Sequence, residues 1–197
     1  MTGQLLLVES GRPLQPHTHF ILSFEGLSTA LVYRDPRRFG RIAVTSREEA
    51  RQPESVRRLG PEPFAWPKEA FSERFKARRG RIKSLLLDQH LLAGLGNIYA
   101  DESLHRSGIR PSRRAHRIPR RRLMLLHDSI CEVLGEAVRH GGSSIDDYVH
   151  LDGRKGNFQA LHRVYGRAGE RCLTCGTAIK RIRLAGRSSY FCPQCQP

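Results

Sequence analysis

Four cysteines near the end of the chain have the residue type and the spacing of a metal site. They form two Cys-x2-Cys pairs separated by sixteen residues, Cys172 with Cys175 and Cys192 with Cys195. Each pair can form a tight turn in which two thiolates converge on one ion, and four thiolates complete the tetrahedron that zinc adopts at structural sites. Because no coordination position is left for water or substrate, we predict one structural zinc ion.

Disulfide bonds are the alternative use of these cysteines. A secreted disulfide scaffold is usually shorter and richer in cysteine, and it follows a signal peptide, whereas this chain begins Met-Thr-Gly-Gln. The fifth cysteine, Cys131, has no cysteine or histidine at the spacing of the other pairs. We expect it to be a core thiol.

The segment between the two cysteine pairs predicts a hairpin. Residues 177–191 contain two short strand-like runs joined near Gly186. The runs are rich in arginine, whose planar guanidinium suits bidentate contacts with phosphate. A metal-fixed hairpin of this kind can display an anion-binding group.

The chain is strongly and unevenly basic. Its formal net charge is +15, and residues 1–65 hold nine Lys and Arg against seven Asp and Glu, which leaves 25 against 12 in residues 66–197. This balance favours a polyanion as partner, above all nucleic acid. A GC-rich genome also raises the arginine content, so charge alone leaves the partner open. No apolar run is as long as a membrane span, and we expect a soluble, cytoplasmic monomer.

The order of patterns predicts an α+β protein with several domains. Residues 1–50 alternate in polarity as strands do, and they predict about four strands, which make a thin sheet. We expect these strands at residues 4–8, 19–24, 29–33 and 41–44. Residues 51–66 are rich in proline and charge, which indicates a linker with at most one short helix.

Helical periodicity begins beyond the linker, and we assign residues 67–160 to a helical domain and residues 161–197 to the ribbon. A short helix is expected around Ile82, and a longer one begins near Pro119 and ends at Gly141. The apolar face of the longer helix consists of Leu123, Leu126, Ile130, Val133 and Ala137.

A glycine-rich turn lies between two of the expected helices. Gly94 and Gly96 allow positive φ angles, and Asn97 is suited to cap the following helix. The free N–H groups at such a helix start can bind an anion, and on a basic surface that anion is a backbone phosphate. An ordinary helical hairpin with glycines is the alternative.

Four motifs occur in one order along the chain: Asp35–Gly40 (DPRRFG), Leu59–Pro63 (LGPEP), Gly94–Glu102 (GLGNIYADE) and the four-cysteine ribbon. In this respect the chain resembles the formamidopyrimidine-DNA glycosylase and endonuclease VIII family, and within it the formamidopyrimidine branch. The resemblance implies a partial amino-terminal β-sandwich, a helix-two-turn-helix domain, a zinc ribbon, and double-stranded DNA with oxidised or abasic sites as the partner.

The resemblance also implies roles for single residues. Lys83, Asn97 and Arg187 match residues that hold phosphates. Arg37 and Phe39 match residues that enter the duplex when the damaged base leaves it, which offsets part of the unstacking cost.

Two further roles follow from the resemblance. Met1 occupies the place of a third gap-filling residue. Arg154, Lys155 and Phe158 lie in a segment similar to the mobile loop that covers the everted base.

Full-length members of the family excise oxidised purines such as 8-oxoguanine and then cleave the abasic strand. The resemblance assigns that chemistry to an amino-terminal proline and the glutamate after it, and both would precede the point where this chain begins. Pro13 and Pro16 are internal, so their nitrogens are amides. We therefore expect this chain to be inactive alone, either as part of a longer enzyme or as a fragment that binds DNA without turnover.

The sequence also allows two other hypotheses about function. One is a non-catalytic zinc-ribbon module that binds RNA or DNA, although a gap-filling motif at Asp35–Gly40 has no purpose there. The other is a misfolded relic, because the unpaired edges of a thin sheet invite aggregation.

Overall fold

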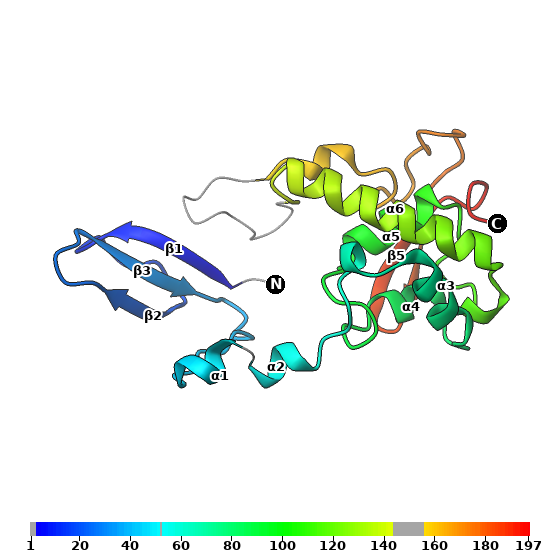
Figure 1. Ribbon diagram of the computed structural model, residues 1–197. Helices are drawn as coiled ribbons and strands as arrows, with labels where there is room; N and C mark the ends of the chain where they lie inside the picture. Colours follow the sequence, from blue (N-terminus) through cyan, green and yellow to red (C-terminus); the bar gives the residue numbers. More distant parts are fainter. Residues whose placement is uncertain (1–2, 52, 144–155) are drawn as a thin grey trace. The chain divides into compact units, whose positions relative to one another are not determined.

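The computed structural model describes residues 3–51, 53–143 and 156–197. It divides into two compact units, Met1–Ser46 with Ala137–Leu161 and Arg47–Glu136 with His162–Pro197 (Figure 1). Each unit is described by itself. No helix among the described residues is both long and apolar enough to cross a membrane.

The first unit contains an antiparallel sheet of three strands, β1 (Gln4–Glu9), β2 (Thr18–Ser23) and β3 (Thr29–Arg34), in the order β1-β3-β2. The fourth strand expected at residues 41–44 is wrong, because these residues form no ladder with another strand. Ile42 is half exposed and Val44 fully so. Alternating polarity predicts a strand only where a partner strand is available to receive its hydrogen bonds.

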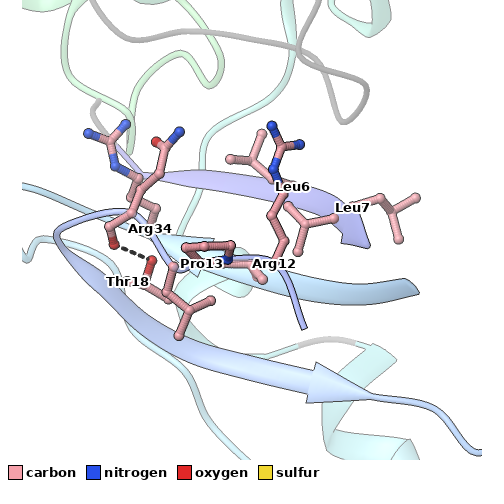
Figure 2. A pocket seen from close by; sticks show the side chains of 10 residues that line it. Leu6, Leu7, Arg12, Pro13, Thr18 and Arg34 are labelled. Carbon is pink, nitrogen blue, oxygen red and sulfur yellow. Dashed lines mark hydrogen bonds between the residues drawn. The ribbon is translucent and has the colours of Figure 1, made fainter. Parts of the chain in front are cut away.

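The two faces of this sheet differ in how far they are covered. Val32 in the central strand is 4% exposed, and the segment Arg12–Gln15 and Leu6 line a hollow of about 230 Å³ beside it (Figure 2). On the other face the outer strands expose apolar side chains. These are Leu5, Leu7, Phe20 and Leu22.

Two prolines of the expected linker, Pro53 and Pro63, stand at the starts of helices. Residues 47–65 form α1 (Arg47–Arg51), α2 (Glu54–Arg57) and the 3-10 turn η1 (Pro63–Ala65), so the prediction of at most one short helix is wrong. Pro53 is the N-cap of α2, and η1 begins at Pro63. Proline suits the first turn of a helix because its missing N–H would have no partner there.

The second unit has a helical core. It is built from α3 (Lys68–Lys76), α4 (Ile82–Leu86), α5 (Asn97–Arg106), the 3-10 turn η2 (Ala115–Arg117) and the first part of α6 (Arg120–Arg139). The start of α6 after Pro119 and its buried apolar stripe confirm the long helix that the sequence predicts. The members of the core that are less than 1% exposed include Phe71, Phe75, Ile82, Leu86, Leu104, Leu123, Leu126 and Ile130.

The ribbon forms the expected hairpin. Strands β4 (Lys180–Leu184) and β5 (Arg187–Phe191) pair antiparallel, with Leu184 opposite Arg187. The two residues between them, Ala185 and Gly186, have φ angles of 46° and 78°. Positive φ at both positions is typical of the tightest hairpin turns. Arg187 therefore stands directly after the turn.

Candidate nucleic-acid interface

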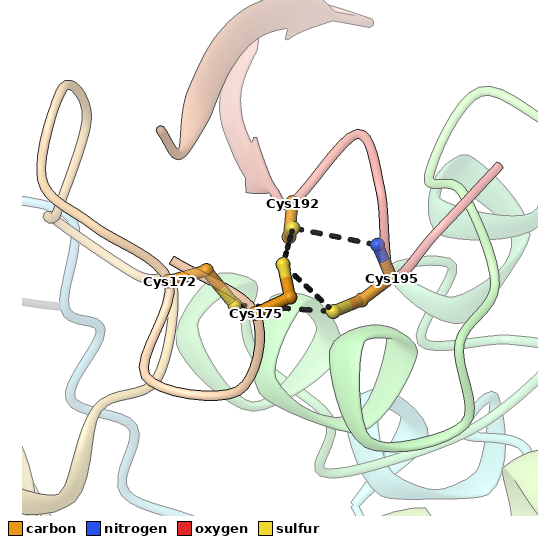
Figure 3. Close-up of side chains that lie close together, drawn as sticks. All are labelled: Cys172, Cys175, Cys192 and Cys195. Atoms are coloured by element: carbon orange, nitrogen blue, oxygen red, sulfur yellow. Dashed lines mark hydrogen bonds between the residues drawn. The ribbon is translucent and has the colours of Figure 1, made fainter. Parts of the chain in front are cut away.

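The four predicted cysteines come together as a metal site (Figure 3). Their sulfur atoms all lie within 4.8 Å of one another, and the Sγ–Sγ distances include 3.4 Å from Cys175 to Cys192 and 3.9 Å from Cys172 to Cys195. Zinc–sulfur bonds of about 2.3 Å place the corners of a tetrahedron about 3.8 Å apart. The four thiols fit one structural zinc ion, as predicted.

The surroundings of two of these cysteines favour zinc binding. Hydrogen bonds from Thr177 lower the pKa of the Cys175 thiol to about 6, which favours the thiolate that binds metal, whereas burial raises the pKa of Cys192 and Cys195. The ring Nε2 of His105, in α5, lies 3.7 Å from Cys172 Sγ, and both side chains are buried. Nothing in the sequence placed this histidine, 67 residues away, beside the ribbon.

Buried polar contacts fasten the ribbon to the helical core. The amide of Gln196 is buried, donates to the carbonyl of Ile109 at 2.8 Å, and accepts from the N–H of Cys192 at 2.9 Å. The guanidinium of Arg110 lies over the ring of Phe191, 4.9 Å from its centre. The ribbon is therefore part of the same packed unit as α5.

The carbonyl of Ser188, next to Arg187, is the point where the helices hold the hairpin. It accepts a hydrogen bond from Lys83 Nζ at 2.8 Å and another from Asn97 Nδ2 at 3.2 Å. The hydroxyl of the same serine accepts from Arg181 Nε at 3.1 Å. Arg187 itself is exposed, so a charged side chain extends from a backbone that is fixed on both sides.

Lys83 forms a buried ion pair with Asp101. The two side chains are 1% and 0% exposed, and Nζ lies 2.7 Å from Oδ1. Asp101 Oδ2 also accepts the N–H of Tyr190 in β5 at 3.0 Å. Burial lowers the pKa of Lys83 and raises that of Asp101 to about 6. The resemblance assigns the Lys83 ammonium to a DNA phosphate, but in this structure it binds Asp101 and the carbonyl of Ser188.

The turn before α5 differs in detail from the sequence prediction. Gly94 has a φ angle of 82°, as expected, but Gly96 has a φ angle of −95°. Gly96 is the N-cap and Asn97 is the first residue of the helix, without a side-chain capping bond. The prediction that Asn97 caps α5 is wrong, because its amide N–H bonds to Ser188 in the ribbon.

A second carboxylate in α5 organises the chain that leads into the ribbon. Glu102 is 4% exposed, and its oxygens accept the backbone N–H groups of Arg163, Val164 and Tyr165 at distances of 2.8 to 3.0 Å. These three N–H groups belong to no regular element, so Glu102 supplies acceptors that a strand would otherwise provide.

In the first unit, Asp35 holds the turn that carries the expected gap-filling residues. Its side chain is 1% exposed and accepts the hydroxyl of Tyr33 at 3.1 Å, the N–H of Arg37 at 3.3 Å and the N–H of Gly40 at 2.8 Å. The Arg37 guanidinium lies over the ring of Phe39, 4.7 Å from its centre, and Phe39 is 59% exposed. A buried anchor therefore presents two exposed side chains together.

Phe158 lies in the 3-10 turn η3 (Phe158–Leu161) and is 2% exposed. Its N–H donates to the carbonyl of Gly142 at 3.0 Å. A Cβ at Gly156 would lie 2.2 Å from the carbonyl oxygen of Gly141, so this glycine permits a close backbone approach. Arg154, Lys155 and Met1 lie outside the described residues.

Two family models match this chain. Residues 59–149 match the formamidopyrimidine-DNA glycosylase H2TH domain, and residues 169–197 match the zinc finger found in FPG and IleRS. H2TH abbreviates helix-two-turn-helix, and its matched range contains α3, α4, α5 and α6.

Similar proteins extend the match to the whole chain. The formamidopyrimidine-DNA glycosylase of Solibacter usitatus is 50% identical over 196 residues, which are 100% of this chain and 71% of the relative. A complex of Lactococcus lactis Fpg with DNA containing an abasic site has a TM-score of 0.90 at 37% identity, covering 100% of this chain and 72% of that one. A MutM complex with DNA containing carbocyclic 8-oxo-G has a TM-score of 0.89 at 38% identity, with the same coverage.

The match to the Solibacter relative includes the Asp35 turn, the glycine turn before α5 and the four cysteines, since it spans the whole chain. The two matched domains contain the helices and the ribbon hairpin that meet at the Ser188 carbonyl. The chain belongs to the formamidopyrimidine-DNA glycosylase family, and it has the helix-two-turn-helix domain and the zinc finger of that family.

Proposed function

We propose that these 197 residues bind double-stranded DNA at oxidised or abasic sites, as a cytoplasmic monomer. The observation that carries the proposal is the shared Ser188 carbonyl, because it fixes the hairpin of the exposed Arg187 to the turn at Asn97. The family resemblance assigns both Arg187 and Asn97 to phosphates, and the hydrogen bond from Asn97 to Ser188 links the two. The solved complexes of L. lactis Fpg and MutM with abasic and 8-oxo-G DNA support the choice of ligand.

In this proposal Arg187 and Asn97 contact phosphates beside the lesion. Lys83 is given a positioning role, because its ammonium is bound to Asp101 and Ser188. Because the backbone of Arg187 is already fixed, only its side chain has to become ordered on binding, and its guanidinium can then make charge-assisted hydrogen bonds to a phosphate.

Arg37 and Phe39 are proposed to fill the gap that an everted base leaves. The Asp35 carboxylate already holds their turn in place, so the backbone of this turn needs little reorganisation when the two side chains enter the duplex. Met1, Arg154, Lys155 and Phe158 keep the roles that the resemblance implies for them, as a further gap-filling residue and as the loop over the lesion.

We further propose that a polypeptide of these 197 residues binds such DNA without cutting it. Its proline nearest the start, Pro13, is internal, and an amide nitrogen cannot act as the amine nucleophile that the family uses. A duplex carrying 8-oxoguanine, incubated with the protein and borohydride, is expected to give no trapped covalent adduct and no nicked strand. Robust trapping would overturn this part of the proposal and leave the binding part standing.

Binding itself is tested by fluorescence anisotropy with four probes of equal length. These are duplexes with 8-oxoguanine, with a stable abasic analogue and without damage, and an RNA hairpin. We expect tighter binding to both damaged duplexes than to the undamaged one. Equal affinity for all four would contradict the proposal and favour a general nucleic-acid-binding module.

A further inference from the structure

Exposed arginines gather on two neighbouring segments of the second unit, away from the ribbon hairpin in sequence. One segment joins α3 to α4 and the other leads into η2. We call the following six side chains the arginine ridge: Arg78, Arg79, Arg81, Arg113, Arg114 and Arg117.

Backbone hydrogen bonds hold the two segments side by side. The N–H of Ala115 donates to Gly80 at 2.9 Å, and the N–H of Ile82 donates to Arg113 at 2.8 Å. The guanidinium of Arg114 adds a hydrogen bond to the carbonyl of Arg79 at 3.1 Å. The ridge is therefore a fixed feature of the helical domain and does not depend on flexible loops.

This arrangement brings like charges together. Arg81 and Arg114 form an antiparallel bridge, which places their Cβ atoms about 5 Å apart, and like charges directly opposite one another destabilise a pair of strands. The ring of His116 lies in the same segment, and its pKa is lowered by burial and then by the charges of Arg117, Arg79 and Arg114. Such repulsion falls when an anion binds.

Carboxylates do not relieve this repulsion. The sequence has no Asp or Glu in residues 74–87 or 103–127, and within the described ranges none of the six ridge arginines has a carboxylate within ion-pair distance. By contrast, Arg120 beside the ridge pairs with Glu73 at 3.4 Å, and Arg58 elsewhere on the unit pairs with Glu54.

We propose that the arginine ridge is a second phosphate-binding site, which takes backbone phosphates of duplex DNA outside the lesion contacts of Arg187 and Asn97. The inference rests on the proposed function for the presence of DNA. Guanidinium groups bind phosphate oxygens in a bidentate manner and read no sequence. The site therefore adds affinity and salt dependence to binding, and it leaves the preference for damage unchanged.

The test compares the variant Arg79→Gln/Arg117→Gln with a matched control, Arg58→Gln/Arg120→Gln. Both double variants remove two exposed positive charges, but the control arginines are already paired with carboxylates. Anisotropy with a 30-base-pair duplex containing a central abasic analogue gives the slope of log Kd against log salt concentration. Each lost phosphate contact lowers this slope by about 0.9, so the ridge variant is expected to lose about 1.8 and the control close to nothing.

Equal salt-dependence slopes for the two variants would overturn the proposal that the arginine ridge binds phosphates. The same titrations with an undamaged duplex keep the two proposals separate, because the ridge variant is expected to retain the wild-type ratio of damaged to undamaged affinity. If the wild-type protein shows no preference for damage, the proposed function fails. If that preference is present but the ridge variant behaves like its control, the ridge alone fails. Circular dichroism confirms that both variants are folded.

Discussion

The ammonium of Lys83 donates a 2.8 Å hydrogen bond to the carbonyl of Ser188, 105 residues further along the chain. The same ammonium is paired with Asp101, which in turn accepts the N–H of Tyr190. Two buried charges on α4 and α5 are therefore used to hold the backbone of β5. The position of Arg187 follows from this small network.

Removing one partner of the Lys83–Asp101 ion pair is expected to lower the free energy of unfolding more than removing both partners. Lys83→Met leaves the Asp101 carboxylate without its cation and should lower the free energy of unfolding by about 3–5 kcal/mol. The double variant Lys83→Met/Asp101→Leu should be closer to the wild-type protein, because no buried charge is left unpaired. Urea denaturation of the zinc-loaded proteins measures both. A double variant less stable than either single one would show that the pair itself supplies the stability.

The raised pKa of Asp101 predicts a pH dependence of stability. The folded-state pKa of about 6 lies above the ordinary aspartate pKa of 3.8, so between these values the folded protein binds more protons than the unfolded chain. The contribution of Asp101 to the free energy of unfolding therefore falls as pH rises through this window, and it levels off above pH 6. Carboxyl carbon NMR should show Asp101 titrating near pH 6. A midpoint near 4 would contradict the effect of burial, and Asp101→Asn identifies the signal.

Loss of Arg187 is expected to weaken DNA binding without unfolding the ribbon. Arg187→Ala should reduce the affinity for abasic-site DNA by about 1–3 kcal/mol, as for one charge-assisted hydrogen bond. Arg171→Ala is the matched control, because Arg171 is an exposed arginine of the same ribbon. If both variants lose equal affinity, the effect is one of net charge and the assigned contact is wrong.

The hydrogen bond between His105 and Cys172 is expected to retain zinc. Residues that hydrogen-bond to metal ligands typically change metal affinity by about 10–100-fold when mutated. His105→Phe should therefore release zinc faster to a coloured chelator than the wild-type protein does. His127→Phe is the control, since His127 is also buried but bonds to Pro63, far from the ribbon in sequence. Equal rates of zinc release from the wild-type protein and both variants would show that His105 does not help to retain zinc.

The exposed apolar face of the sheet predicts low local stability. Amide hydrogens in β1 and β2 should exchange faster than those in α5 and α6, because few apolar side chains of the outer strands are buried. Hydrogen exchange followed by mass spectrometry measures both parts in one sample. Equal protection would show that the sheet is stabilised by contacts other than the described ones.

The sequence predicts those parts of the structure that depend on local pattern. The cysteine spacing, the hairpin turn at Gly186 and the apolar stripe of α6 are each set by residues close together in the chain, and the structure confirms them. Residues 41–44 also have a strand pattern, but a strand needs a partner that local sequence cannot supply.

The candidate site was harder to predict because its contacts are long-range. Asn97 looks like a helix cap and Lys83 looks like a surface lysine when each is read with its neighbours. Both side chains instead donate hydrogen bonds to the carbonyl of Ser188, which lies about half the chain length away in sequence. Glu102 and His105 were missed for the same reason, since nothing near them in sequence indicates the ribbon.

The contacts between α5, its neighbours and the ribbon also affect how the chain can fold during synthesis. The bonds from Lys83, Asn97, Asp101 and Gln196 each join residues 87 to 105 positions apart. Contacts of such high sequence separation form late and slow folding. Until the ribbon has been made, the side chains of Lys83 and Asn97 lack the Ser188 carbonyl to which they bond in the folded unit. We therefore expect the second unit to complete its packing late in synthesis, after its helices have already been made.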